Sequence, residues 1–76
     1  MITVLEGADD KFLLQCDYKS ELDRLNNFVG DCFPEAKFFE GKSGGKPTLF
    51  LERSLGIPEK LNSLDAMTKL LVSNNL

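Results

Sequence analysis

Histidine and tryptophan are absent from the chain, and only two cysteines occur among its 76 residues. Histidine is the usual general base near neutral pH and the commonest metal ligand, so its absence removes Ser-His-Asp and Cys-His catalysis. The two cysteines, Cys16 and Cys32, are too far apart for a Cys-x-x-Cys motif. We therefore expect no enzymatic activity, no bound metal and no cofactor, and we expect both thiols to be reduced and buried in a cytoplasmic protein.

Long apolar runs are also lacking, because none exceeds a few residues and none follows a basic start. A membrane-spanning helix needs about 20 apolar residues, and a signal peptide needs a shorter apolar core behind a basic segment. We expect neither a membrane segment nor an export signal. The length of 76 residues fits one small domain, residues 1–76, which we expect to be a monomer.

The net charge of −3 is spread unevenly along the sequence. Residues 1–35 carry three cations and eight anions, whereas residues 36–76 carry six cations and four anions. Such an asymmetry predicts a polarised surface. A dedicated, strongly basic nucleic-acid module would have an excess of cations instead.

Alternation of apolar and polar residues predicts two short strands, at 1–5 and at 11–16, that pair as a hairpin. The second of these strands directs Phe12, Leu14 and Cys16 to one face, and Leu13 and Gln15 to the other. The connecting turn at 6–10 is expected to use Gly7 as its residue with positive φ.

From Tyr18 onward the apolar spacing becomes helical, and Pro34 sets the end of the predicted helix. Asp17 is the expected N-cap, with Ser20 as the alternative. The predicted apolar stripe of this helix consists of Tyr18, Leu22, Leu25, Val29 and Cys32.

The stretch 36–53 has two apolar, aromatic-rich runs around a glycine-rich centre, which predicts a second hairpin with a long, flexible tip. The glycines of this tip, each able to adopt positive φ, are Gly41, Gly44 and Gly45. We expect the leucines of the returning strand, Leu49 and Leu51, to face the helix together with Phe38, which leaves Phe39 and Phe50 on the outer face. A register slip of one residue would exchange the two sets.

Residues 54–58 are expected to be irregular because they contain Gly56 and Pro58. A second helix is predicted at 64–73, capped by Asn62 or Ser63. The order of elements is then β-β-α-β-β-α. Short connections favour hairpins, so we expect an α+β fold with an antiparallel four-stranded sheet packed against two helices.

The segment Gly41–Lys46 reads Gly-Lys-Ser-Gly-Gly-Lys and superficially resembles a phosphate-binding loop. Its glycine spacing is too short, Pro47 replaces the magnesium-binding hydroxyl residue, and a strand is predicted to follow where that loop requires a helix N-terminus. We therefore interpret the segment as a hairpin tip with solvated lysines.

Exposed aromatic rings beside cations are typical of surfaces that hold single-stranded nucleic acid, because rings stack on bases and cations follow phosphates. The predicted nucleic-acid-binding residues all lie in the second hairpin: Lys37, Phe39, Lys42, Lys46, Phe50 and Arg53. The alternative is that the phenylalanines belong to the core or cover the surface of a protein partner.

Four segments carry a resemblance that extends from Ile2 to about Leu71, and they are Ile2–Glu6, Phe12–Asp17, Ser20–Leu25 and Gly45–Leu51. In these the chain resembles the small accessory proteins encoded beside the UvsW recombination helicase of T-even bacteriophages. The order of elements is also similar to the small N-terminal domain of such helicases. The resemblance implies a stand-alone α+β module that works with a DNA recombination and repair helicase, in the host cytoplasm if the chain is phage-encoded.

Two functions are compatible with these patterns. In the first, the chain is an accessory module of DNA recombination and repair that binds single-stranded DNA weakly through the 36–53 hairpin, as the clustered lysines favour. In the second, it is an acidic module that docks on a helicase or another replication protein, as the net charge of −3 favours. The resemblance is compatible with both.

Overall fold

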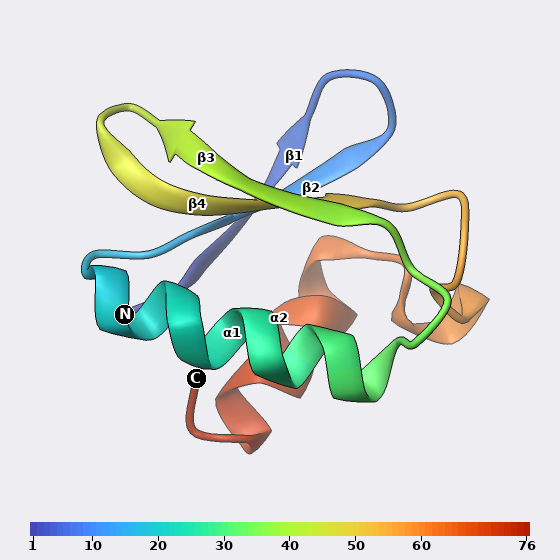
Figure 1. Cartoon of the computed structure of the whole chain (residues 1–76). Helices are drawn as coiled ribbons and strands as arrows, with labels where there is room; N and C mark the ends of the chain where they lie inside the picture. Colours follow the sequence, from blue (N-terminus) through green and yellow to red (C-terminus); the bar gives the residue numbers. More distant parts are fainter.

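The computed structural model describes residues 1–76 and has one antiparallel sheet with two α-helices on one of its faces (Figure 1). The elements are β1 (Thr3–Gly7), β2 (Lys11–Gln15), α1 (Lys19–Cys32), β3 (Phe38–Ser43), β4 (Lys46–Glu52), the short 3-10 helix η1 (Glu59–Leu61) and α2 (Leu64–Ser73). The predicted α+β class and the predicted order β-β-α-β-β-α are therefore confirmed. Neither helix has the length and apolar character needed to cross a membrane.

The strand order in the sheet is β1-β2-β4-β3, so the two hairpins meet through the central pair β2 and β4. In this pair Phe12 lies opposite Leu51 and Leu14 lies opposite Leu49. All four side chains are buried and face the helices. The predicted orientation of Leu49 and Leu51 is therefore confirmed, and Phe38 of β3 packs against the same core.

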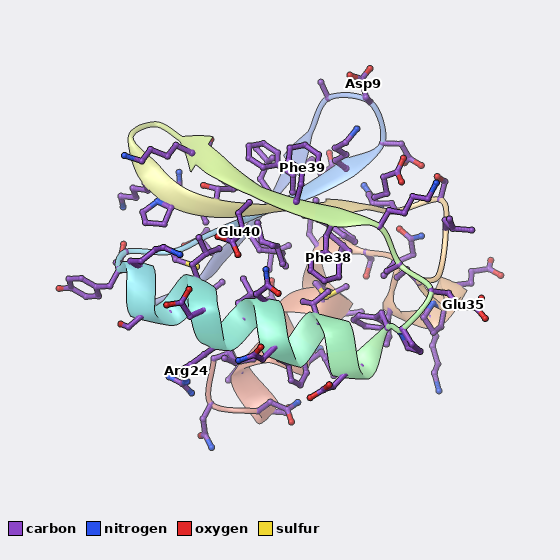
Figure 2. The ribbon with its side chains drawn as sticks, viewed as in Figure 1. Asp9, Arg24, Glu35, Phe38, Phe39 and Glu40 are labelled. Carbon is purple, nitrogen blue, oxygen red and sulfur yellow. The ribbon has the colours of Figure 1, made fainter.

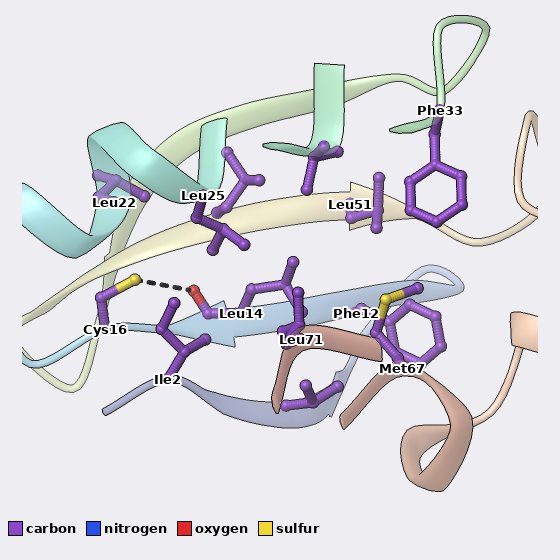
Figure 3. Packing of buried hydrophobic residues seen from close by; sticks show 13 residues of the cluster. Ile2, Phe12, Leu14, Cys16, Leu22, Leu25, Phe33, Leu51, Met67 and Leu71 are labelled. Atoms are coloured by element: carbon purple, nitrogen blue, oxygen red, sulfur yellow. Dashed lines mark hydrogen bonds between the residues drawn. The ribbon is translucent and has the colours of Figure 1, made fainter. Parts of the chain in front are cut away.

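The core lies between this sheet face and the two helices (Figure 3). Helix α1 contributes Leu22, Leu25 and Val29, whereas α2 contributes Met67 and Leu71. The spacing of these residues brings each apolar stripe onto one side of its helix, so both helices are held mainly by tertiary packing.

The ends of α1 differ from the prediction. Its N-cap is Tyr18, which is exposed, and neither Asp17 nor Ser20 caps the helix. The carboxylate of Glu21, at the third helical position, supplies the returning half of a capping box, because its Oε1 accepts hydrogen bonds from the backbone N–H groups of Asp17 and Tyr18, both at 2.9 Å. At the other end Cys32 is exposed rather than buried, since Phe33 turns into the core instead.

Cys16 is buried as predicted, and it is a free thiol. Its Sγ lies 3.9 Å from the carbonyl oxygen of Leu14, to which it donates a weak hydrogen bond (Figure 3). Burial raises the pKa of the Cys16 thiol to about 11. The group therefore stays protonated near neutral pH and behaves as a small apolar side chain.

Both hairpin turns also differ from the prediction. Gly7 does not adopt positive φ, because β1 continues to this residue and pairs it with Lys11. The turn is made by Asp9 and Asp10, at φ of 58° and 56°, and aspartate is among the few residues that tolerate this region.

The tip of the second hairpin is short rather than long and flexible. Strand β3 continues through Gly41 to Ser43, and β4 begins at Lys46. Only Gly44 and Gly45 form the turn, at φ of 59° and 79°. A two-residue turn with positive φ at both positions matches the twist of the flanking strands, so it fixes the register of the hairpin.

The segment after β4 is irregular, as predicted, until η1 begins at Glu59. Ser63, rather than Asn62, caps α2, because its Oγ accepts a hydrogen bond from the N–H of Ala66 at 3.1 Å. Gly56 has a φ of 78° and lies against the backbone of Ala36. This contact joins the connection after β4 to the segment that precedes β3.

Replacing Leu25 by alanine should lower the free energy of unfolding by about 2–5 kcal/mol, because the side chain is fully buried between α1 and the sheet. The matched control is Leu55→Ala, at a leucine that is exposed outside the core. We expect that control to change stability by about 0.5 kcal/mol or less. Denaturant unfolding measures both values, and equal effects would show that the stripe of α1 is not the main support of the sheet.

Gly56→Ala should destabilise the chain more than Gly45→Ala does. The two glycines have nearly the same φ, 78° and 79°, but an added Cβ at Gly56 would lie 2.5 Å from the backbone nitrogen of Ala36, whereas one at Gly45 meets nothing within 4 Å. Gly45→Ala therefore isolates the conformational cost of about 1–2 kcal/mol. Gly56→Ala should add about 1–3 kcal/mol for the forced backbone shift. Thermal melts of equal midpoint would contradict this account.

Candidate nucleic-acid interface

The second face of the sheet carries no helix, and we call it the outer face (Figure 1). Figure 2 shows that Phe39 points away from α1, whereas Phe38 and Glu40 point towards it. The pairing of the strands aligns one apolar side chain from each strand across the outer face, in the order Leu5, Leu13, Phe50, Phe39. We call these four residues the apolar row.

The predicted position of Phe39 and Phe50 on the outer face is therefore confirmed. They are direct cross-strand partners, and their rings stack with centroids 5.0 Å apart and an angle of 6° between the planes. Phe39 lies on the edge strand β3 and is 54% exposed, whereas Phe50 on the central strand β4 is half-buried. A stacked aromatic pair on adjacent strands also stabilises the sheet itself.

Two lysines lie on the outer face next to the apolar row. Lys37 shares the face of Phe39 because it precedes it by two residues, and its carbonyl oxygen accepts a hydrogen bond from the N–H of Glu52 at 3.0 Å. Lys11 lies opposite Glu52 on the other side. Neither lysine forms an ion pair with a carboxylate. Glu52 thus lies between Lys11 and Lys37 in the sheet, and it forms an ion pair with neither.

The other two predicted lysines lie near the hairpin turn. Lys42 is exposed and lies opposite Pro47. Successive residues of a strand point to opposite faces. Because Gly41 lies on the outer face, Lys42 projects from the helix side of the edge strand. The Nζ of Lys46 lies 3.2 Å from Oδ1 of Asp17. The pKa of Asp17 is held below its usual value first by the ammonium group of Met1 and then by Lys46. Lys46 is exposed, but its charge is partly neutralised.

Arg53 lies apart from the outer face. Its guanidinium carbon is 4.3 Å from the centre of the Phe12 ring, and Phe12 belongs to the core. The Nε donates to the side-chain oxygen of Asn62 at 2.8 Å, and the amide of Asn62 donates back to the backbone oxygen of Arg53 at 2.6 Å. A further contact of 3.5 Å joins Arg53 to Glu6. These contacts assign Arg53 to the joint between the sheet and the segment before α2.

The structure therefore brings three of the six predicted residues together on the outer face: Lys37, Phe39 and Phe50. Sequence reasoning missed Lys11, Leu5 and Leu13 as members of this surface. Their alternation with the buried residues of β1 and β2 assigns them to the outer face, but only the long-range pairing of β2 with β4 shows that they adjoin Phe50 and Glu52.

The segment Gly41–Lys46 forms the end of β3, the turn and the start of β4, so no helix N-terminus follows it. No group of three or more histidine, cysteine, aspartate or glutamate side chains is placed to hold a metal ion, and the structure contains no pocket. A scan of protein-family models and searches of curated proteins and solved structures find no match for the chain.

Proposed function

We propose that the chain is a non-enzymatic module that binds single-stranded DNA weakly through its outer face. The observation that carries this proposal is the stacked pair Phe39–Phe50 on a helix-free sheet face, next to two lysines that form no ion pair. Base–aromatic stacking contributes about 1–3 kcal/mol per base and requires an unpaired base. The lysines supply the contacts to the phosphates that flank such a base.

The electrostatic contribution to this binding is small. Lys11 and Lys37 have Glu52 between them on the same face, and the chain as a whole carries a charge of −3. Lys42 and Lys46 extend the cationic character to the hairpin turn, although Asp17 offsets Lys46. Affinity should therefore be low, and it should fall as the salt concentration rises.

A second candidate function uses the same surface. The apolar row crosses all four strands, and its outermost members Leu5 and Phe39 are 38% and 54% exposed. An exposed apolar patch with a polar surround is also what a protein partner would cover. In this proposal the partner is a helicase or another replication protein, and the carboxylates, including Glu52, contribute to recognition.

The resemblance to accessory proteins encoded beside a recombination helicase supports a role in DNA recombination and repair for either candidate. A weak single-strand binder that works beside a helicase would meet its ligand wherever the helicase opens a duplex. This wider role is part of the proposal and depends on the sequence resemblance alone.

Lys37→Ala and Lys11→Ala should each weaken binding of a fluorescein-labelled thymidine oligonucleotide and reduce the slope of log K against log salt by about 0.7, the value for one lost phosphate contact with a single strand. The matched control is Lys60→Ala, because Lys60 lies in η1 on the helix side and also lacks an acidic partner. Fluorescence anisotropy at several salt concentrations measures the slopes. Absence of binding at the lowest salt concentration would rule out the DNA proposal.

Glu52→Gln should strengthen binding to the same oligonucleotide, because it removes the one negative charge between Lys11 and Lys37. Glu59→Gln is the matched control, since Glu59 lies in η1, away from the outer face. Both substitutions remove one negative charge from the chain, so a difference in DNA affinity between them reports the position of the charge rather than the net charge. If Glu52→Gln leaves DNA binding unchanged but weakens capture of a purified helicase, the protein-partner candidate is favoured.

A further inference from the structure

We infer that Phe39 alone presents a free ring face to one unpaired nucleobase, and that Phe50 and Gly41 act as positioning residues that hold this ring in place. The inference rests on the proposed single-strand binding and deepens it, because it assigns different roles to the two stacked rings. It also names the ligand feature that is recognised, which is an unpaired base rather than the phosphate chain.

The different roles follow from the positions of the rings in the sheet. Phe50 is on β4, between β2 and β3, so its cross-strand neighbours are Leu13 on one side and Phe39 on the other. Phe39 is on the edge strand, and one side of its ring is occupied by Phe50. No further strand lies beyond β3 and Phe39 is 54% exposed, so we place the base on the ring face that Phe50 does not cover.

Gly41 explains how Phe50 holds its orientation. An added Cβ at this position would lie 2.9 Å from Cε1 of Phe50, which is closer than Cβ atoms pack in proteins. Gly41 lies within β3 and does not adopt positive φ, so its backbone conformation does not require glycine. The absence of a side chain at Gly41 therefore makes room for the ring of Phe50, which lies over the Gly41 backbone. The ring of Phe39 stacks parallel to the ring of Phe50.

The two neighbours of Phe39 along β3 differ in what they place beside its ring. Residues two apart on a strand share a face and are separated by about 7 Å, so Lys37 and Gly41 are the neighbours of Phe39 on the outer face. Lys37 supplies a cation on one side, and on the other side the Phe50 ring occupies the space over Gly41. This arrangement admits one planar base with its phosphate towards Lys37. A base inside a duplex has both faces already stacked, so a single strand is preferred.

The test compares two labelled oligonucleotides of twelve thymidines, one of them with abasic sites at all internal positions. The unmodified protein should bind the thymidine strand more tightly, because only that strand offers bases for stacking. Phe39→Ala should lose about 5- to 150-fold in affinity for the thymidine strand while keeping the salt slope, since the lysines remain. It should then bind the two strands equally.

Gly41→Ala should also reduce affinity for the thymidine strand at an unchanged salt slope, because the new Cβ displaces the Phe50 ring and with it Phe39. Combining Gly41→Ala with Phe50→Leu tests whether the effect on binding passes through Phe50, since a smaller side chain at position 50 accommodates the new Cβ. Gly41→Ala should cost less affinity in the Phe50→Leu background than in the unmodified protein. Gly30→Ala on α1 is the control, because its Cβ meets only an ordinary contact of 3.8 Å. Circular dichroism verifies that each variant folds.

The outcomes separate the two levels of the proposal. If the unmodified protein binds neither strand at low salt, the proposed function fails. If it binds both strands equally, or if Phe39→Ala binds thymidine as tightly as the unmodified protein, the single-strand function stands and the assignment to Phe39 is overturned. If Gly41→Ala costs the same in both backgrounds, Gly41 does not act through Phe50.

Discussion

The pairing of β2 with β4 is the interaction on which the rest of the structure depends. Each hairpin forms from residues close in sequence, but two separate hairpins are marginally stable in water. Their union puts Phe12 and Leu14 beside Leu51 and Leu49, and so creates an apolar face wide enough for both helices. The same register builds the outer face, because it sets Leu13 against Phe50 and Lys11 against Glu52. Core and candidate site are therefore two sides of one long-range contact.

The sequence predicts those features that depend on local periodicity. The spacing of two in both hairpins and the helical spacing from Leu22 to Val29 identify the elements and their inward faces, including the outward position of Phe39 and Phe50. Features that depend on contacts between distant residues are not predictable in this way. Arg53 follows a strand among other cations and looks available to a phosphate, but the ring of Phe12 and the amide of Asn62 engage it.

Errors at the turns and caps have a related cause. Glycine, aspartate and serine are all compatible with several local conformations, so composition alone does not choose among them. In the first hairpin the extension of β1 to Gly7 transfers the positive φ to Asp9 and Asp10. At the start of α1 the N-cap position falls on Tyr18, and the carboxylate of Glu21 accepts hydrogen bonds from the backbone N–H groups of Asp17 and Tyr18. In both places hydrogen bonds to neighbouring residues determine which of several locally compatible residues takes the turn or cap position.

If the outer face binds a single strand as proposed, two of its polar side chains are not free to read the base sequence. Recognition of a base by its edge needs free donors and acceptors. Gln15 donates to the backbone oxygen of Ser43 at 2.9 Å, and the hydroxyl of Thr48 donates to the backbone oxygen of Lys46 at 2.9 Å. Both groups are thus committed within the sheet, and they support the hairpin rather than a ligand. In the proposed function the contacts to DNA come instead from the Phe39 ring face and from Lys11 and Lys37, and such groups accept any base and any phosphate.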